Sequence, residues 1–344
     1  MSAPLSVAST VALEYIAQNP NLPSKTLARL LTLEEPALFP DLEKARRRVL
    51  FFRGQSGARN RRHAARAHGE LFRPAGSVRD GWVPLPVPIG ELDQWQFRRY
   101  EFDRALVISD VHVPFHDRQA LEIALREGQR RKVDCIILNG DIADFYSVSK
   151  FEKDPRLRNF KVEVEATRLF LEHLRSRFKR AQIVYKEGNH EERLWRYALT
   201  AAPDFFAVED GDGERLLGLA KLLDFAEYGI ELVDNKQPIL AGEHLYLLHG
   251  HEFRAPFQNP VNPARGLFLR AKCNALCGDL HQTSAHSEAG IDRVTSCWSV
   301  GCLCQLRPAY CPLNKWNHGF AVIELASQGA WSVTNHKIIN GAVV

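Results

Sequence analysis

The stretch VDCIILNGD, residues 133–141, joins a run of apolar residues to a glycine and an aspartate. A short continuous apolar run bounded by a turn residue is typical of a strand buried on both faces. RALVISD at 104–110 and QIVYKEGNH at 182–190 have the same form. Segments with helical spacing, residues 118–130 and 162–178, separate the three runs. This alternation predicts a largely parallel sheet with helices packed on it.

The second helical segment and the later apolar runs extend this pattern. Helical spacing within residues 162–178 is expected to bring five side chains to one apolar face: Ala166, Leu169, Phe170, Leu174 and Phe178. The later runs have few helical patterns between them and are expected to form a second sheet: residues 244–250, 274–279, 293–300, 318–325 and 330–338. We therefore predict an α/β protein with the architecture of an αββα sandwich.

Residues 1–54 have a different rhythm, because three short helical patterns follow one another with a proline-containing link. Ser24 and Asp41 are the expected N-caps of the second and third helices. Three short helices joined in this way favour a small helix-turn-helix-like module. A basic and proline-rich linker, residues 55–102, is expected to connect this module to the sandwich at residues 103–344.

The positive charge of the chain is local. The net charge is +4, but residues 41–75 alone contain ten lysines and arginines and only three acidic residues. Such a cluster fits contacts with the phosphate backbone of DNA or RNA. A solvated helical face followed by a flexible linker explains it equally well.

Cysteine usage and hydropathy indicate the compartment. Seven cysteines, an odd number in a chain of 344 residues, argue against a disulfide framework, and their spacings fit none of the usual zinc patterns. The N-terminus lacks the basic start and apolar run of a signal peptide, and no segment approaches the length of a membrane span. We therefore expect a cytoplasmic protein with no membrane partner, whereas the oligomeric state cannot be inferred.

Five apolar runs end in Asp, His or Asn, which are residue types that bind metal ions in proteins. The pairs are Asp110 and His112, Asp141 and Asp144, Asn189 and His190, His249 and His251, and Asp279 and His281. One such pair after a strand would more often cap a helix or form a turn. In open α/β sheets, however, ligands bind beyond the carboxyl ends of the strands. Five pairs in register therefore predict one shared metal site.

The motifs D-x-H, G-D-x-x-D, G-N-H-E, H-G-H and G-x-x-H, in this order, resemble the calcineurin-like metallophosphoesterase family. The resemblance covers roughly residues 103–344 and implies a metal-dependent phosphoesterase. The stretch VGCLCQLRPAYCPLNKWNHGFAVIEL also resembles phage and prophage members of the family, which implies the host cytoplasm for a phage-encoded chain. Within it, Trp316 and His318 either line the cleft or pack in the core.

The resemblance also implies a role for each site residue. His190 would donate a proton to the leaving group, and Asp144 would orient it. His251 is a ligand, a partner of a ligand or a substrate contact. One metal ion would be held by Asp110, His112 and His281, the second by Asn189, His249 and the variant residue Asp279, and Asp141 would bridge the two ions.

The chemistry of these side chains agrees with the implied roles. Two divalent cations about 3.5–4 Å apart neutralise the charge of a phosphoryl group and activate water. Ligation by Asp, His and Asn together suits Mn, Fe or Zn better than Mg or Ca, and we expect Mn first. His190 suits proton donation because the ordinary pKa of histidine lies near neutrality.

Two positions depart from the pattern of the family. Asp279 stands where a histidine is usual; it either binds the second metal ion or only hydrogen-bonds its turn. Phe145 stands where many phosphatases of the family have an arginine that clamps phosphate. Arg193, His116 or Lys186 are the candidates to replace that arginine.

Three functions are open from the sequence. The favoured one is a dinuclear-metal phosphodiesterase or nuclease that acts on nucleic acid or nucleotides. The second is a phosphomonoesterase or phosphoprotein phosphatase whose N-terminal helices bind protein, which the missing arginine disfavours. The third is a non-catalytic DNA-binding protein whose metal site is degenerate at Asp279, which the otherwise complete ligand set disfavours.

Overall fold

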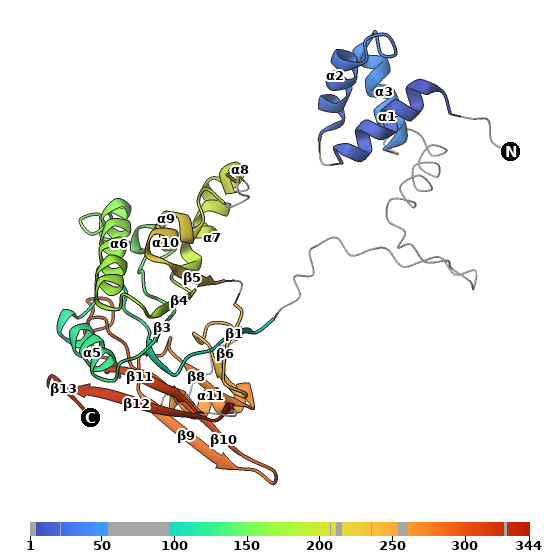
Figure 1. Ribbon diagram of the computed structural model, residues 1–344. Coiled ribbons are helices and arrows are strands. Elements are labelled where there is room, and N and C mark those ends of the chain that lie inside the picture. The colour runs from blue at the N-terminus through green and yellow to red at the C-terminus, as the bar shows by residue number, and fades with distance from the viewer. Residues whose placement is uncertain are drawn as a thin grey trace. The chain divides into compact units, whose positions relative to one another are not determined.

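The computed structural model describes residues 5–20, 22–53, 96–206, 208–210, 215–234, 236–253, 261–326 and 329–344. The chain divides into two compact units, Met1–Asp93 and Gln94–Val344 (Figure 1). Most of the expected basic and proline-rich linker, including the arginine-rich part of residues 41–75, lies outside the described residues.

The described residues of the N-terminal unit form three helices, α1 (Val7–Gln18), α2 (Ser24–Glu34) and α3 (Leu42–Phe52). The Asp41 side chain caps α3 as expected, because it accepts a hydrogen bond from the Lys44 backbone N–H at 2.8 Å. The expected cap at Ser24 is wrong, because α2 begins at Ser24 itself and its N-cap is Pro23, which has no side-chain acceptor. The helices bury a common core formed by Ala12, Ile16, Leu27, Leu31, Phe39, Val49 and others.

Some of the basic residues of this unit make internal contacts. Arg53, which follows α3, donates to three backbone carbonyls of the turn between α1 and α2, at 2.6, 3.1 and 3.3 Å. Arg48 donates to the Ser9 hydroxyl of α1 at 2.6 Å. These two arginines hold the helices together, whereas Lys44 and Arg47 are exposed on α3.

The C-terminal unit contains two sheets (Figure 1). The first has the strand order β13-β12-β11-β2-β3-β4-β5. Its strands are β2 (Arg104–Ile108), β3 (Cys135–Asn139), β4 (Gln182–Lys186), β5 (Ile230–Val233), β11 (His318–Leu325), β12 (Trp331–Ile339) and β13 (Ala342–Val343). The expected strand runs at 104–110, 133–141 and 182–190 are the central parallel strands β2, β3 and β4.

The second sheet has the strand order β1-β6-β7-β8-β10-β9. Its strands are β1 (Arg98–Tyr100), β6 (Ile239–Ala241), β7 (Leu245–Leu247), β8 (Asn274–Cys277), β9 (Ser284–Ala289) and β10 (Val294–Ser299). Strand β1 pairs with β6, so this sheet starts before residue 103.

Two of the strands expected in the second sheet belong to the first. Strands β11 and β12 extend the first sheet, and β11 pairs antiparallel with β2. The reason is that β11 is buried on both faces. Ala321 and Ile323 face the core between the sheets, whereas Phe320 and Val322 face the helices. A strand buried on both faces fits the middle of a sandwich layer and not its edge.

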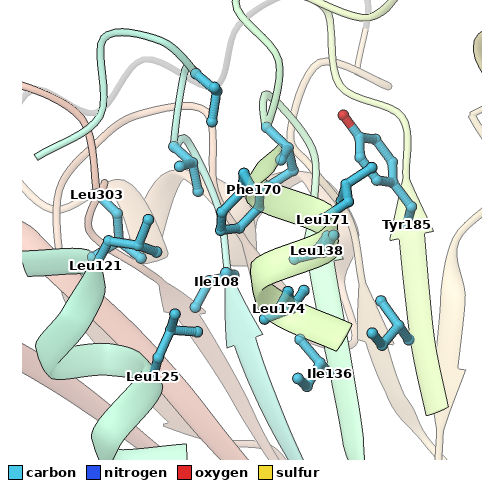
Figure 2. Packing of buried hydrophobic residues seen from close by; sticks show 14 of the residues in the cluster. Ile108, Leu121, Leu125, Ile136, Leu138, Phe170, Leu171, Leu174, Tyr185 and Leu303 are labelled. Carbon is cyan, nitrogen blue, oxygen red and sulfur yellow. The ribbon is translucent and has the colours of Figure 1, made fainter. Parts of the chain in front are cut away.

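Helices cover both outer faces, which confirms the predicted αββα layers. α5 (Arg118–Arg130) and α6 (Phe160–Arg177) pack on the first sheet, where Leu125 and Leu174 meet Ile108 and Leu138 (Figure 2). α11 (Pro263–Ala271) packs on the second sheet. The remaining short helices are η1 (Tyr146–Val148), α7 (Glu192–Ala201), α8 (Pro203–Phe206), α9 (Leu219–Leu222) and α10 (Phe225–Tyr228). Among the described residues, no helix is long and apolar enough to cross a membrane.

The buried face of α6 differs from the expected one by a small rotation. Leu169 was expected to be buried, but 65% of its surface is exposed. Leu171 is fully buried instead, one turn from the buried Leu174 (Figure 2). The buried stripe also contains Val164 and Thr167. The apolar pattern permits either face, and packing against Ile136 and Leu138 of the sheet selects the second.

We expect Leu171→Ala to lower the free energy of unfolding by about 2–5 kcal/mol, because it leaves a cavity beneath α6. Leu169→Ala is the matched control on the same helix and should change the free energy by less than about 0.5 kcal/mol. Urea denaturation followed by tryptophan fluorescence would measure both. Equal losses would contradict the assignment of the buried face.

Candidate metal centre

The five expected ligand pairs lie in loops at the carboxyl ends of β2, β3 and β4 in the first sheet and β7 and β8 in the second. Five of the residues have left-handed backbone conformations, with φ between 52° and 63°: Asp110, His112, Asp141, Asp279 and His281. Such conformations cost a non-glycine residue about 1–3 kcal/mol and cluster at functional sites. The backbone of these loops therefore accepts a local conformational cost, and in return it directs the five side chains toward one place.

One group of donor atoms surrounds Asp110. The donor atoms of Asp110, His112 and Asp141 lie within 4.8 Å of one another. His281 joins this group, because its Nε2 lies 3.1 Å from Asp110 Oδ1 and 3.3 Å from His112 Nε2. All four side chains are buried.

A second group surrounds His249. The donor atoms of Asp141, His249 and Asp279 also lie within 4.8 Å of one another. His249 Nε2 lies 3.3 Å from Asp141 Oδ1 and 3.7 Å from Asp279 Oδ1. The Asn189 side-chain oxygen lies 3.2 Å from the same nitrogen. Asp141 thus belongs to both groups, which is the position of a bridging ligand.

The histidines have the orientation of metal ligands. His112 Nδ1 lies 2.9 Å from Asp144 Oδ1, and His249 Nδ1 lies 2.8 Å from the Asn139 carbonyl oxygen. His281 Nδ1 faces Cys304 Sγ at 3.8 Å. Each Nε2 therefore points into the centre, and metal-binding histidines are usually held through the other nitrogen in this way. Donor atoms 3.1–3.7 Å apart also suit a shell with bonds of about 2.1 Å. The residues fit a pair of divalent ions.

The charges of the centre are mutually dependent. Burial raises the pKa of the Asp110 and Asp141 carboxyls, but neighbouring histidines outweigh it and lower both pKa values. Burial lowers the pKa of the His249 and His281 imidazoles, but the aspartates outweigh it and raise both values well above the ordinary range. Divalent cations bound here would replace those protons as the positive partners of the carboxylates.

His190 lies beside His112, with the ring centroids 4.3 Å apart, and is held by Asp144. Its Nδ1 is 3.0 Å from Asp144 Oδ1, and its backbone N–H donates to Asp141 Oδ1 at 2.8 Å. The same Asp144 oxygen contacts His112, so one carboxylate orients two histidines. Burial lowers the pKa of His190, but Asp141 and Asp144 outweigh it, and the pKa is raised overall.

Of the three candidates for the missing arginine, only Arg193 reaches His190. Arg193 Nη2 lies 2.7 Å from His190 Nε2, and its Nη1 donates to the Asp144 carbonyl at 2.8 Å. Lys186 is fully buried and pairs with Glu252 at 2.8 Å. Phe145 is buried and stacks on Phe160 with the ring centroids 5.9 Å apart.

His116 and His251 lie at the edges of the site. His116 is part of an isolated bridge with Cys304, and burial lowers the pKa of its imidazole. His251 Nε2 lies 3.0 Å from Glu192 Oε1, which turns it away from the two donor groups. The His251 ring also lies against the expected ligand His249, with the centroids 5.3 Å apart, so a partner of a ligand is the role that fits its position best.

Two buried glutamates position the loops, and neither was expected from the sequence. Glu191 accepts hydrogen bonds from four backbone N–H groups, three of them in residues 141–143 and one at Gly188, and from the Tyr185 hydroxyl. Glu252 accepts from the backbone N–H groups of His249 and Gly250. Each glutamate stands one residue after an expected site histidine, in G-N-H-E and H-G-H-E, which was the available signal.

Two glycines of the motifs have different reasons to be glycine. Gly140 has φ +86°, and a Cβ there would lie 2.3 Å from His249 Nδ1. Gly188 has no unusual φ, but a Cβ would lie 2.2 Å from Asp141 Oδ1. A side chain at either position would displace a ligand.

The fold and the site together define a metal-dependent phosphoesterase, and residues 104–272 match the calcineurin-like phosphoesterase family. The C-terminal unit therefore contains a calcineurin-like phosphoesterase region. It is 25% identical over 237 residues to the Gene 54 protein of Mycobacterium phage L5, covering 65% of this chain and 90% of that protein. The Gene 54 protein of Mycobacterium phage D29 is 25% identical over 232 residues, covering 64% and 88%.

Similarity to solved structures is weaker. Vacuolar Protein Sorting 29 from Cryptosporidium parvum has a TM-score of 0.37 and 14% identity, covering 71% of this chain and 95% of its own. The E. coli phosphoesterase Yfce has a TM-score of 0.33 and 13% identity, covering 67% and 98%. A dimetal phosphatase from Danio rerio has a TM-score of 0.36 and 11% identity, covering 67% and 95%.

We expect Asp279→Ala to remove one of two Mn ions per chain and leave the other, because Asp279 lies only in the group around His249. Equilibrium dialysis against Mn followed by elemental analysis would give the stoichiometry. Asp292→Ala, in the exposed turn between β9 and β10, is the matched control and should bind as the natural chain does. Unchanged stoichiometry in Asp279→Ala would mean that Asp279 only supports its turn.

Proposed function

We propose that the C-terminal unit hydrolyses phosphodiester bonds in nucleic acids or nucleotides with the help of two divalent metal ions, Mn first and Fe or Zn as alternatives. The observation that carries the proposal is the position of Asp141, which is shared by the donor groups around Asp110 and His249. A shared carboxylate between two sets of nitrogen and oxygen donors suits a two-metal site.

Each side chain then has a defined task. Two bound cations would neutralise the phosphoryl oxygens and lower the pKa of a water molecule. His190 would donate a proton from Nε2 to the leaving oxygen while Asp144 holds Nδ1. The first ion would be held by Asp110, His112, His281 and the second by Asn189, His249, Asp279, with Asp141 between them.

Arg193 would change partners when substrate binds. Its guanidinium now lies 2.7 Å from His190 Nε2, the atom that must be free to give a proton. An anionic phosphate oxygen is a stronger acceptor for a guanidinium than a neutral imidazole is. A bound phosphate would therefore draw Arg193 away and gain its charge. His190 Nε2 would then take up a proton from water, and this proton would pass to the leaving group.

The sparse positive charge beside His190 favours a diester as the substrate. A phosphodiester carries one negative charge, whereas a phosphomonoester carries nearly two at neutral pH. Phe145 stands where many phosphatases of the family have an arginine that clamps phosphate, and it packs in the core. The charge of Lys186 is neutralised by Glu252. A phosphomonoesterase or phosphoprotein phosphatase is the alternative that the assay below would detect.

We expect the full-length protein with Mn to hydrolyse the diesters bis-p-nitrophenyl phosphate and thymidylyl-thymidine in preference to p-nitrophenyl phosphate. His190→Ala should slow thymidylyl-thymidine cleavage by about 10²- to 10⁴-fold, because an alkoxide leaving group needs a proton. The loss on bis-p-nitrophenyl phosphate should be smaller, because p-nitrophenolate leaves without one.

His244→Ala, at an exposed histidine in the turn between β6 and β7, is the matched control and should retain full activity. Equal losses on the two diesters in His190→Ala would contradict the role of proton donor. A faster rate on the monoester would favour the alternative, and no turnover with Mn, Fe or Zn would contradict both.

We further propose that the N-terminal unit contacts the phosphate backbone of nucleic acid through its basic region, residues 41–75. Lys44 and Arg47 of α3 are exposed and support this proposal. Arg48 and Arg53 make internal contacts, so they are not assigned to nucleic acid. The two phage proteins among the relatives support an action in the cytoplasm of a host cell.

The double substitution Lys44→Glu and Arg47→Glu should weaken binding to a labelled DNA strand and reduce the slope of log affinity against log salt by about two. Lys179→Glu with Arg180→Glu, an exposed pair on the C-terminal unit, is the charge-matched control. Fluorescence anisotropy at several NaCl concentrations would measure the slopes. The same slope in both variants would refute a nucleic-acid contact at α3.

A further inference from the structure

The segment from residue 305 to residue 317 is fastened to the metal centre at both of its ends. The Gln305 backbone N–H donates to the Phe115 carbonyl at 3.0 Å, in the loop that carries His112. The Asn317 backbone N–H donates to the carbonyl of His281 at 2.9 Å. This segment, the 305–317 loop, is therefore positioned by the same loops that present the metal ligands.

Asn314 ties the 305–317 loop across its middle. Its side-chain amide donates to the carbonyls of Leu306 and Cys311, both at 2.7 Å, and its side-chain oxygen accepts from the Trp316 backbone N–H at 2.9 Å. The loop thus has a defined shape before any ligand arrives. A surface that is ordered in advance loses less conformational entropy on binding.

Two aromatic rings extend from the centre along this loop. The Trp316 and His281 ring centroids are 4.2 Å apart, and Tyr310 lies beyond Trp316 with the centroids 6.3 Å apart. Burial raises the pKa of the Tyr310 hydroxyl to about 12, and the negative charge of Asp144 adds to this effect. Nevertheless 79% of the residue is exposed. The ring of Tyr310 is therefore accessible from solvent.

We propose that Tyr310 and Trp316, whose rings meet edge to face at 64°, form a stacking shelf for an unpaired nucleobase, namely the base of the nucleotide whose phosphate lies at the metal centre, and that the base stacks on the exposed Tyr310 ring. Every base has a flat π face that stacks on aromatic side chains without regard to sequence. This inference rests on the proposed function and narrows its substrate to single-stranded nucleic acid or mononucleotide esters.

The position of the two rings favours a base over the ring of an aryl phosphate. In a nucleotide the sugar separates the base from the phosphorus, so the base lies at a distance from the metal ions. Trp316 lies directly against His281, and Tyr310 lies one ring farther out. An aryl ester, whose ring is bonded to the phosphate oxygen, would reach Trp316 and leave Tyr310 unused.

Isothermal titration calorimetry on the full-length protein with Mn tests the shelf without catalysis. The ligands are thymidine 5′-monophosphate and 2-deoxyribose 5-phosphate, which differ by the base. We expect the natural chain to bind the nucleotide at least about five-fold more tightly than the sugar phosphate, the lower limit for stacking on an aromatic residue. Tyr310→Ala should reduce this ratio to about one, and Tyr310→Phe should retain it.

Several results would overturn the shelf. These are the same ratio in all three proteins, a ratio of one in the natural chain, or no binding of either ligand at millimolar concentration. Tighter binding of O-phosphotyrosine than of the nucleotide, with the same dependence on Tyr310, would assign the rings to aryl esters. Turnover of thymidylyl-thymidine is a separate measurement, so loss of the shelf and loss of the phosphodiesterase function are distinguishable.

Discussion

The centre depends on the way Glu191 holds the loop that carries Asp141. One buried carboxylate accepts four backbone N–H groups and the Tyr185 hydroxyl, so it joins the loop after β3 to the loop after β4. An unpaired buried carboxylate is costly, and a fully hydrogen-bonded one is not. Glu191 therefore resists any movement of the loop, and Asp141 keeps the place in which it serves both donor groups.

Two other acceptor groups of the site are also shared between partners. Asp144 contacts His112 and His190 with one oxygen, so the geometry of a ligand and that of the proposed proton donor are linked. His249 is held through the Asn139 carbonyl, which also accepts from the Ser109 hydroxyl. Neighbouring loops are therefore joined through shared acceptor atoms, namely Asp144 Oδ1 and the Asn139 carbonyl oxygen.

The two sheets have different parts in building the centre. The first sheet supplies three adjacent parallel strands, so Asp110, Asp141 and Asn189 leave it at one edge. The second sheet supplies His249 and His281 from the parallel neighbours β7 and β8. The apolar core between the sheets, with Val107, Ile137, Leu247 and Leu276, holds these two edges together. The metal centre is therefore a product of the face-to-face packing.

Much of the fold could be read from the sequence, because its signals are local. The parallel strands β2, β3 and β4 and helix α5 were expected at their observed places, since apolar runs and helical spacing need no long-range information. Three predictions were wrong: that Ser24 caps α2, that Leu169 is buried and that β11 belongs to the second sheet. The buried face of α6 and the sheet of β11 are decided by packing against residues that are distant in the sequence.

The sequence by itself determined the residue types of the site and their order along the chain, because five strand ends followed by Asp, His or Asn form a local pattern. Only the tertiary structure decided which of them meet. Asp279 lies near His249, and His251 contacts Glu192. Arg193 lies beside His190, whereas Lys186 pairs with Glu252. The physical reason is that hydrogen bonds and ion pairs act over a few ångströms, and the sheet packing alone determines which side chains come within that distance.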